Sequence, residues 1–205
     1  MKTKNILLLI SIVVVLVSLF YSFWGNQDQT TYINKIKKER EEKDHFMKTS
    51  DESPFRKKRD EFSALKYYPV NPQFKIVADL TPVKDKNVMV LATSDGKEER
   101  YIEYAYAEFD FNGLHNKLLI LEMMEMGPSK GKLFLAFGDE TSGDETYGAG
   151  RYIDVAKVMG SQTITLDFNN AYNPYCAYAD EFSCPFPPAE NLLKIAVTAG
   201  EKTYH

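Results

Sequence analysis

The sequence predicts a mainly β protein, either an antiparallel β-sandwich or a partly closed barrel, preceded by a transmembrane helix and a polar helix. Three observations lead to this prediction. Residues 6–24 are almost entirely apolar, residues 31–48 are highly charged without Gly or Pro, and at least seven short β-type segments follow residue 67. Many short strands joined by turns are typical of sandwiches and barrels. Strands do not alternate with long helical patterns, which disfavours an α/β fold.

The apolar run at the amino terminus is long enough to cross a membrane. About nineteen residues at a rise of 1.5 Å cover close to the ~30 Å hydrocarbon core of a bilayer. Lys2 and Lys4 precede the run, and positive charge on a short flank favours a cytoplasmic amino terminus. We therefore expect a cytoplasmic tip at residues 1–4 and a signal-anchor at residues 5–24. The rest of the chain would lie outside the cytoplasm, held at the inner cell membrane.

A cleaved signal peptide is the alternative, and it would give a secreted protein. Cleavage requires small residues at the end of the apolar run. Phe20, Tyr21, Phe23 and Trp24 stand there instead, and bulky aromatic residues are typical of the membrane interface. The sequence therefore favours an uncleaved anchor.

Beyond the anchor the chain is acidic. With Lys2 and Lys4 set aside, 23 Lys and Arg residues remain against 29 Asp and Glu residues, a net charge of about −6. A nucleic-acid partner requires a basic surface, so we expect none. The glycine-rich fingerprints of phosphate and dinucleotide sites are also missing from the sequence, and we expect no cofactor.

Residues 25–53 are predicted to form a polar helical stalk. Residues 31–48 are rich in helix formers, and Pro54 disfavours helical geometry at the residue before it. The apolar stripe of this helix is thin, which indicates that only one edge can contact the domain. Residues 54–205 are then the β-rich extracytoplasmic domain.

β-type residues and turn residues alternate through this domain. Asn112–Gly113 is a strong hairpin signal, and Gly or Pro closes several other segments. The expected strands cover Phe74–Leu80, Val88–Thr93, Glu99–Phe111, Lys117–Met126, Lys132–Phe137, a segment starting near Arg151, Thr163–Phe168 and Leu193–Thr198.

Residues 138–154 form a glycine-rich, acidic segment. Its carboxylates would suit a hard cation, but their spacing fits no EF-hand, so we expect an ordinary loop and no metal site. Arg151 lies in this segment. A buried guanidinium needs a carboxylate partner, which Asp139, Glu145 or Asp167 can supply. Arg151 is therefore either a structural strut or a clamp for an anionic ligand.

Residues 172–188 hold both cysteines and four of the nine prolines. Two cysteines in a segment placed outside the cytoplasm predict a disulfide between Cys176 and Cys184; free buried thiols and a metal site are the alternatives. Zinc needs four ligands and a catalytic cysteine needs a histidine partner, but the three histidines are distant in the sequence. The aromatic residues favour a lid over one end of the domain, or a surface for a carbohydrate or peptide.

The two loops together form the candidate binding surface. We expect the loop at residues 138–152 to pack beside the loop at residues 172–188. The residues assigned to this surface are Asp139, Glu145, Tyr147, Arg151, Tyr152, Asp167, Asn173 and Tyr175.

Several sequence blocks between residues 43 and 201 carry a family resemblance. They include Leu65-Lys-Tyr-Tyr-Pro-Val-Asn-Pro72, Phe137-Gly-Asp-Glu-Thr-Ser-Gly-Asp-Glu-Thr-Tyr147, Gly150-Arg-Tyr-Ile153 and Cys184-Pro-x-Pro-Pro188. In these blocks the sequence resembles the bacterial domain of unknown function 1684 family. The resemblance implies a single β-rich domain behind a signal or anchor, and it implies no reaction.

The sequence thus predicts a membrane-anchored extracytoplasmic module that binds a ligand or has a structural role in the cell envelope. No motif identifies its small-molecule or envelope partner. The alternative is a hydrolase that uses Arg151 and a carboxylate between the 138–152 and 172–188 loops. Since no nucleophile stands with a histidine in a known pattern, we favour the binding module over an enzyme.

Overall fold

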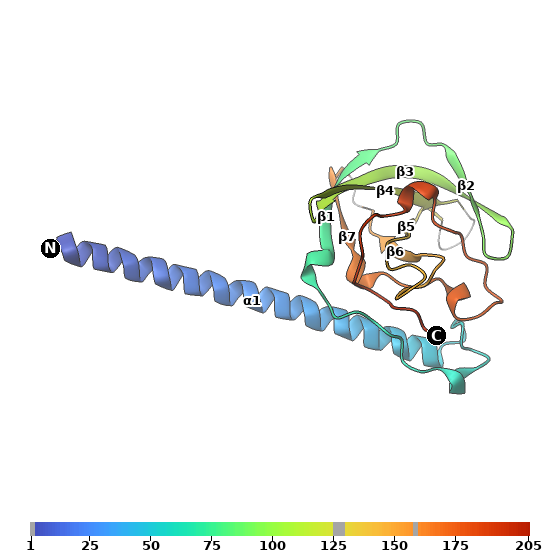
Figure 1. Cartoon of the computed structure of the whole chain (residues 1–205), viewed down its shortest axis with the longest axis horizontal. Helices are drawn as coiled ribbons and strands as arrows, with labels where there is room; N and C mark the ends of the chain where they lie inside the picture. The colour runs from blue at the N-terminus through green and yellow to red at the C-terminus, as the bar shows by residue number, and fades with distance from the viewer. Residues whose placement is uncertain (1–2, 125–129, 158–159) are drawn as a thin grey trace.

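The computed structural model consists of one long helix and one curved antiparallel sheet (Figure 1). It describes residues 3–124, 130–157 and 160–205, and within residues 3–26 it describes the side chains of residues 12, 13 and 15. The elements are α1 (Thr3–Thr49), β1 (Lys75–Pro82), β2 (Val88–Ala92), β3 (Glu98–Phe111), β4 (Leu114–Met123), β5 (Leu133–Phe137), β6 (Arg151–Val155) and β7 (Thr163–Asp167), with short 3-10 turns η1 (Arg59–Glu61), η2 (Pro72–Phe74), η3 (Phe168–Asn170), η4 (Tyr175–Ala177) and η5 (Ala189–Asn191).

The sheet is a half-barrel with the strand order β6-β5-β4-β3-β1-β7, and β2 also pairs with β3. All pairs are antiparallel, so the predicted mainly β, antiparallel fold is confirmed. The long strand β3 pairs with β2 through its first part and with β1 through its second part. The register shift between Glu103 and Ala105 lies where this partner changes. A bulge bends a strand and increases its twist, which helps the sheet to curve.

The hairpin predicted at Asn112–Gly113 joins β3 to β4. Asn112 has φ 51° and Gly113 has φ 79°, as expected for a two-residue hairpin turn with both central residues at positive φ. The strand expected over Lys117–Met126 begins earlier, at Leu114, and ends at Met123. Met126 lies outside the described residues.

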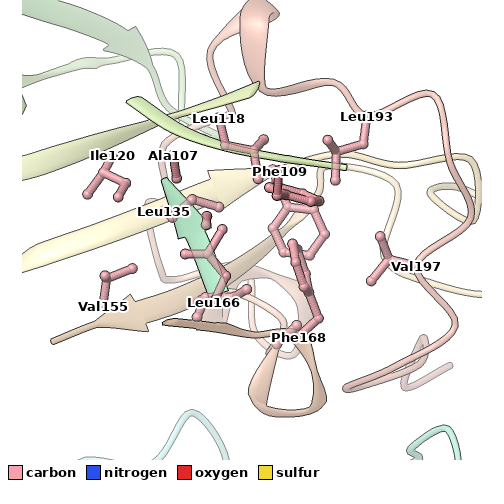
Figure 2. Packing of buried hydrophobic residues seen from close by; sticks show 14 of the residues in the cluster. Ala107, Phe109, Leu118, Ile120, Leu135, Val155, Leu166, Phe168, Leu193 and Val197 are labelled. Carbon is pink, nitrogen blue, oxygen red and sulfur yellow. The ribbon is translucent and has the colours of Figure 1, made fainter. Parts of the chain in front are cut away.

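The main core lies between one face of the sheet and the C-terminal segment. Leu193 and Val197 of that segment pack in the same cluster as Phe109 and Leu118 of the sheet (Figure 2). The strand expected over Leu193–Thr198 is wrong. This segment is extended and alternates buried with exposed residues, but much of its backbone bonds to side chains and loops instead of a neighbouring strand.

The helix predicted over residues 31–48 is part of α1, which ends at Thr49. Figure 1 shows one end of α1 projecting away from the domain while the other end runs along it. Ile36 and Met47 are buried, so one edge of the helix docks as expected. The predicted anchor at residues 5–24 also lies in α1, but most of its side chains are outside the described part. In the part of the chain that is described, no helix combines the length and apolarity required to cross a membrane.

Candidate functional site

Arg151, the first residue of β6, lies inside the domain and not on its surface. Its side chain is fully buried, and its Nη2 donates to Oδ2 of Asp139 at 2.8 Å. The guanidinium also donates to the carbonyl oxygens of Val197 at 2.9 Å, of Ala199, and of Glu201 at 3.1 Å. These contacts are those of a structural strut. The alternative prediction, that Arg151 clamps an anionic ligand, is wrong, because a fully buried guanidinium cannot meet a ligand from solvent.

Glu145 and Asp167, the other expected carboxylate partners of Arg151, make different contacts. Glu145 is exposed, and the ammonium group of Lys202, 2.9 Å away, lowers the pKa of its carboxyl. Asp167 accepts a hydrogen bond of 2.8 Å from the hydroxyl of Tyr32 on α1, so it helps to dock the helix. Among the described residues, no group of three or more His, Cys, Asp or Glu side chains could hold a metal ion.

A cleft of about 660 Å³ lies between α1, the sheet face opposite the main core, and the segments on both sides of η4. Of the eight residues assigned to the binding surface, Tyr152 and Tyr175 line this cleft, whereas the other six do not. The sheet contributes Glu99 and Tyr101 of β3, Met123 of β4, Phe134 of β5, and Tyr152 and Asp154 of β6.

Four aromatic rings in the cleft follow one another across the sheet, and we call Tyr101, Phe134, Tyr152 and Tyr172 the aromatic row. The ring centroids are 5.0 Å apart from Tyr101 to Phe134, 5.5 Å from Phe134 to Tyr152, and 5.9 Å from Tyr152 to Tyr172. These separations are typical of favourable aromatic pairs. The row therefore gives the cleft a continuous aromatic floor.

Two cationic side chains of α1 form the opposite wall. Lys43 lies 2.7 Å from Oε1 of Glu201, and its ammonium nitrogen lies 4.5 Å from the ring centroid of Tyr172. Arg40 donates to the carbonyls of Tyr68 at 2.8 Å and Asn169 at 3.1 Å. Both cations thus have partners within the protein.

Glu201 links the walls of the cleft to each other. Its side chain is 2% exposed. Beyond the ion pair with Lys43, its Oε2 accepts hydrogen bonds from the backbone N–H of Asn173 at 2.8 Å and from the hydroxyl of Tyr178. One buried carboxylate therefore holds α1 and the loop after β7 together. Asn173 contributes to this contact through its backbone N–H, and it is buried and not a surface residue.

The carboxylates of Glu99 and Asp154 are bound differently. Oδ1 of Asp154 accepts the hydroxyl of Tyr172 at 2.8 Å, and Glu99 accepts the hydroxyl of Tyr101. Burial and the nearby Asp154 raise the pKa of Tyr172 well above its ordinary value, so this hydroxyl keeps its proton and donates it. Among the described residues, neither Glu99 nor Asp154 has a cationic partner within 4.0 Å.

The two cysteines are free thiols in the structure, so the predicted disulfide is not formed in it. They are nevertheless neighbours, since the backbone N–H of Cys176 donates to Sγ of Cys184 at 3.2 Å. A hydrogen bond from the Cys184 thiol lowers the pKa of Cys176, and the hydroxyl of Tyr147 lies 3.8 Å from Sγ of Cys176. Cys184 also lines the cleft.

A family model described as "Protein of unknown function (DUF1684)" matches residues 60–202. The chain belongs to this family. The resemblance seen in the sequence blocks is thereby confirmed. A search of curated proteins finds no match to the DUF1684 chain.

Among solved structures, the chain is similar to an uncharacterized protein of Haloarcula marismortui, whose structure was determined by solution NMR. The two sequences are 36% identical, the match covers 87% of this chain and 99% of the archaeal chain, and the TM-score is 0.66. The archaeal protein is described only as uncharacterized, so this similarity adds no activity to the DUF1684 domain.

Sequence reasoning missed most of the residues that line the cleft of this DUF1684 protein. Arg40 and Lys43 lie on the helix face that also carries the buried Ile36 and Met47. Residues three or four apart share one face of a helix. Two cations between two apolar positions on one face were therefore a signal that charged groups of α1 meet the domain.

Proposed function

We propose that this domain binds a small organic molecule in the cleft between α1 and the half-barrel. The observation that carries the proposal is the aromatic row at the base of a cavity of about 660 Å³. Small-molecule sites typically enclose about 300–1,000 Å³ and combine apolar or aromatic walls with a few placed polar groups. The cleft has both features, because carboxylates and tyrosine hydroxyls border the row.

The contacts that join the walls of the cleft also support a binding role. Its walls come from α1, the sheet and the C-terminal half of the chain, and Glu201 bonds to the first and the last of these. Arg40 and Asp167 add further contacts between α1 and the domain. Binding to a preformed site avoids much of the entropy cost of ordering side chains and loops.

The alternative prediction, a hydrolase, is no longer supported. It required Arg151 with a carboxylate in a solvent-open site between the two loops, and both Arg151 and its partner Asp139 have fully buried side chains. We therefore propose binding and no reaction.

We further propose that residues 5–24 anchor the domain in the inner membrane, with the cleft outside the cytoplasm. The apolar run and the preceding Lys2 and Lys4 support this topology. Ile12, Val13 and Val15 are each about half exposed on α1. Carbonate extraction of membranes and protease treatment of spheroplasts test the proposal. The anchor predicts a protein that resists extraction and is degraded from outside, whereas release of a shortened chain into the medium would show cleavage.

A thermal-shift screen of a small-molecule library on the full-length chain tests the binding function. A compound present at about 100 times its Kd stabilises the folded state by about 2.7 kcal/mol, which raises Tm by roughly 5–10 °C for a chain of this size. Met123→Trp should abolish the shift, because Met123 lines the cleft and the larger side chain fills it.

Met124→Trp is the matched control. Met124 is exposed next to Met123 and does not line the cleft, so this variant should keep the response of the native chain. Compounds that stabilise both variants equally would bind elsewhere, and a screen without any compound sensitive to Met123→Trp would refute the proposal.

A further inference from the structure

We infer that the ligand of the cleft is an organic cation, with an ammonium group that meets Glu99 or Asp154 and an apolar body that lies on the aromatic row. This inference rests on the proposed function and names the chemical class of the ligand. It follows from the balance of charges in the cleft and from the partners that each charge already has.

Carboxylates outnumber cations among the residues that line the cleft. Four acidic side chains face two basic ones, which leaves a net formal charge of −2. The acidic residues are Glu39, Glu99, Asp154 and Glu201, and the basic residues are Arg40 and Lys43. An acidic cleft with low-dielectric walls attracts cations and repels anions.

The two basic residues already have partners within the protein, so they are less available to bind an anionic ligand. Lys43 is held by Glu201 at 2.7 Å and by the ring of Tyr172. The two terminal nitrogens of Arg40 donate to backbone carbonyls, and its guanidinium carbon lies 4.4 Å from the ring centroid of Tyr67. A ligand carboxylate would have to displace these contacts to form a bidentate pair.

The carboxylates of Glu99 and Asp154, by contrast, can each form an ion pair with a cationic ligand. Each accepts a tyrosine hydroxyl, and neither has a salt-bridge partner in the described part of the chain. They belong to β3 and β6, which are separated by β4 and β5 in the sheet. The two carboxylates therefore stand on strands at opposite sides of Phe134, and a cation has a counter-charge at either end of the row.

Aromatic rings favour the same class of ligand. The face of an aromatic ring attracts a cation, and cages of such rings recognise organic ammonium groups. The rim of this cleft already uses that interaction twice, with Lys43 over Tyr172 and Arg40 over Tyr67. An ammonium group from outside would meet rings of the same kind together with the carboxylates of Glu99 and Asp154, which accept tyrosine hydroxyls and have no salt-bridge partner in the described part of the chain.

Calorimetric titration of the full-length chain in non-ionic detergent tests the inference with three compounds that share a phenol ring. Tyramine carries an ammonium group, tyrosol carries a hydroxyl in its place, and 4-hydroxyphenylacetate carries a carboxylate. We expect tyramine to bind about tenfold or more tightly than the other two, because only its charge is complementary to the cleft.

Substitutions assign the binding to the two carboxylates. The double variant Asp154→Asn with Glu99→Gln should weaken the binding of tyramine about tenfold and leave the binding of tyrosol unchanged, since the amides can still accept the tyrosine hydroxyls. The single variant that shows the same loss identifies the carboxylate that meets the ammonium group. Asp79→Asn is the matched control, because Asp79 is exposed on β1 and does not line the cleft. It should bind tyramine like the native chain.

The outcomes separate this inference from the proposed function. If tyrosol or 4-hydroxyphenylacetate binds as tightly as tyramine and Met123→Trp abolishes that binding, the cleft binds small molecules but does not select cations. If none of the three binds and the compounds sensitive to Met123→Trp are neutral or anionic, the inference fails and the proposed function stands. If no compound at all is sensitive to Met123→Trp, both fail.

Discussion

The guanidinium of Arg151 and the carboxylate of Asp139 lie 2.8 Å apart, and neither side chain is exposed. Asp139 follows β5 and Arg151 begins β6. Oδ1 of Asp139 accepts the backbone N–H of Val197 at 3.3 Å, while Arg151 donates to the carbonyls of Val197, Ala199 and Glu201. The pair therefore gives the C-terminal segment hydrogen bonds that a neighbouring strand would otherwise supply.

Replacing Arg151 by Met should lower the free energy of unfolding by about 3–5 kcal/mol, the usual cost of removing one partner of a buried ion pair. The substitution leaves the charge of Asp139 buried without its partner and three carbonyls without their donor. Urea denaturation of the purified chain measures the loss. Arg100→Met, at an exposed position of β3, should change the stability by no more than about 0.5 kcal/mol. An equal loss of stability in the two variants would contradict the structural role of Arg151.

The pattern of the sequence was sufficient to predict most of the sheet, because its signals act over a few residues. The turn at Asn112–Gly113 and the alternation in Thr163–Asp167 depend on local backbone geometry. The segment Leu193–Thr198 has the same alternation, yet its partners include side chains that lie far away in the sequence. Alternation reports that a segment is extended and half-buried, and it does not report which groups bond to its backbone.

The cleft could not be predicted in the same way. Lys43 and Glu201 come from opposite ends of the chain and meet only after α1 has docked. The sequence correctly indicates that Arg151, if buried, needs a carboxylate partner. It could not show whether the pair faces solvent, because that depends on the C-terminal segment that covers it.

Gly200 should not tolerate alanine. It has φ +78°, and an added Cβ would lie 2.6 Å from the carbonyl oxygen of Ala171 and 2.7 Å from that of Phe168. Gly200→Ala therefore adds a clash with backbone to the strain of a positive φ, which by itself costs about 1–3 kcal/mol. Gly96 has the same φ with open space around it, so Gly96→Ala carries the strain alone. We expect Gly200→Ala to lower the midpoint of urea denaturation clearly more than Gly96→Ala, and an equal loss would show that no clash exists.

The stability of the domain should fall at alkaline pH because of buried tyrosines. Burial, reinforced by Glu201, Cys184 and Asp154 respectively, raises the pKa values of Tyr67, Tyr152 and Tyr172 well above the ordinary tyrosine value. Above pH ~10 the unfolded chain loses these protons and the folded chain keeps them, so stability decreases as pH rises, by roughly 1.4 kcal/mol per pH unit for each tyrosine.

Urea denaturation at pH 8, 9.5 and 11 measures this slope. Tyr172→Phe removes one of the three groups and should make the slope shallower by the contribution of one tyrosine. A free energy of unfolding that stays constant from pH 8 to 11 would show that these hydroxyls ionise as readily in the folded chain as in the unfolded one.

Cys176 and Cys184 should form a disulfide when the protein meets an oxidant such as oxidised glutathione. The lowered pKa of Cys176 increases the share of thiolate, the form that attacks an external disulfide. This attack gives a mixed disulfide and releases one reduced glutathione; the adjacent Cys184 thiol then loses its proton and displaces the second. The closed loop of about nine residues should stabilise the fold by roughly 2–3 kcal/mol.

Intact mass should show the loss of two hydrogens, and denaturation with and without reductant should show the stabilisation. Cys176→Ser should show neither change, and a native chain that keeps its reduced mass in excess oxidant would rule the disulfide out.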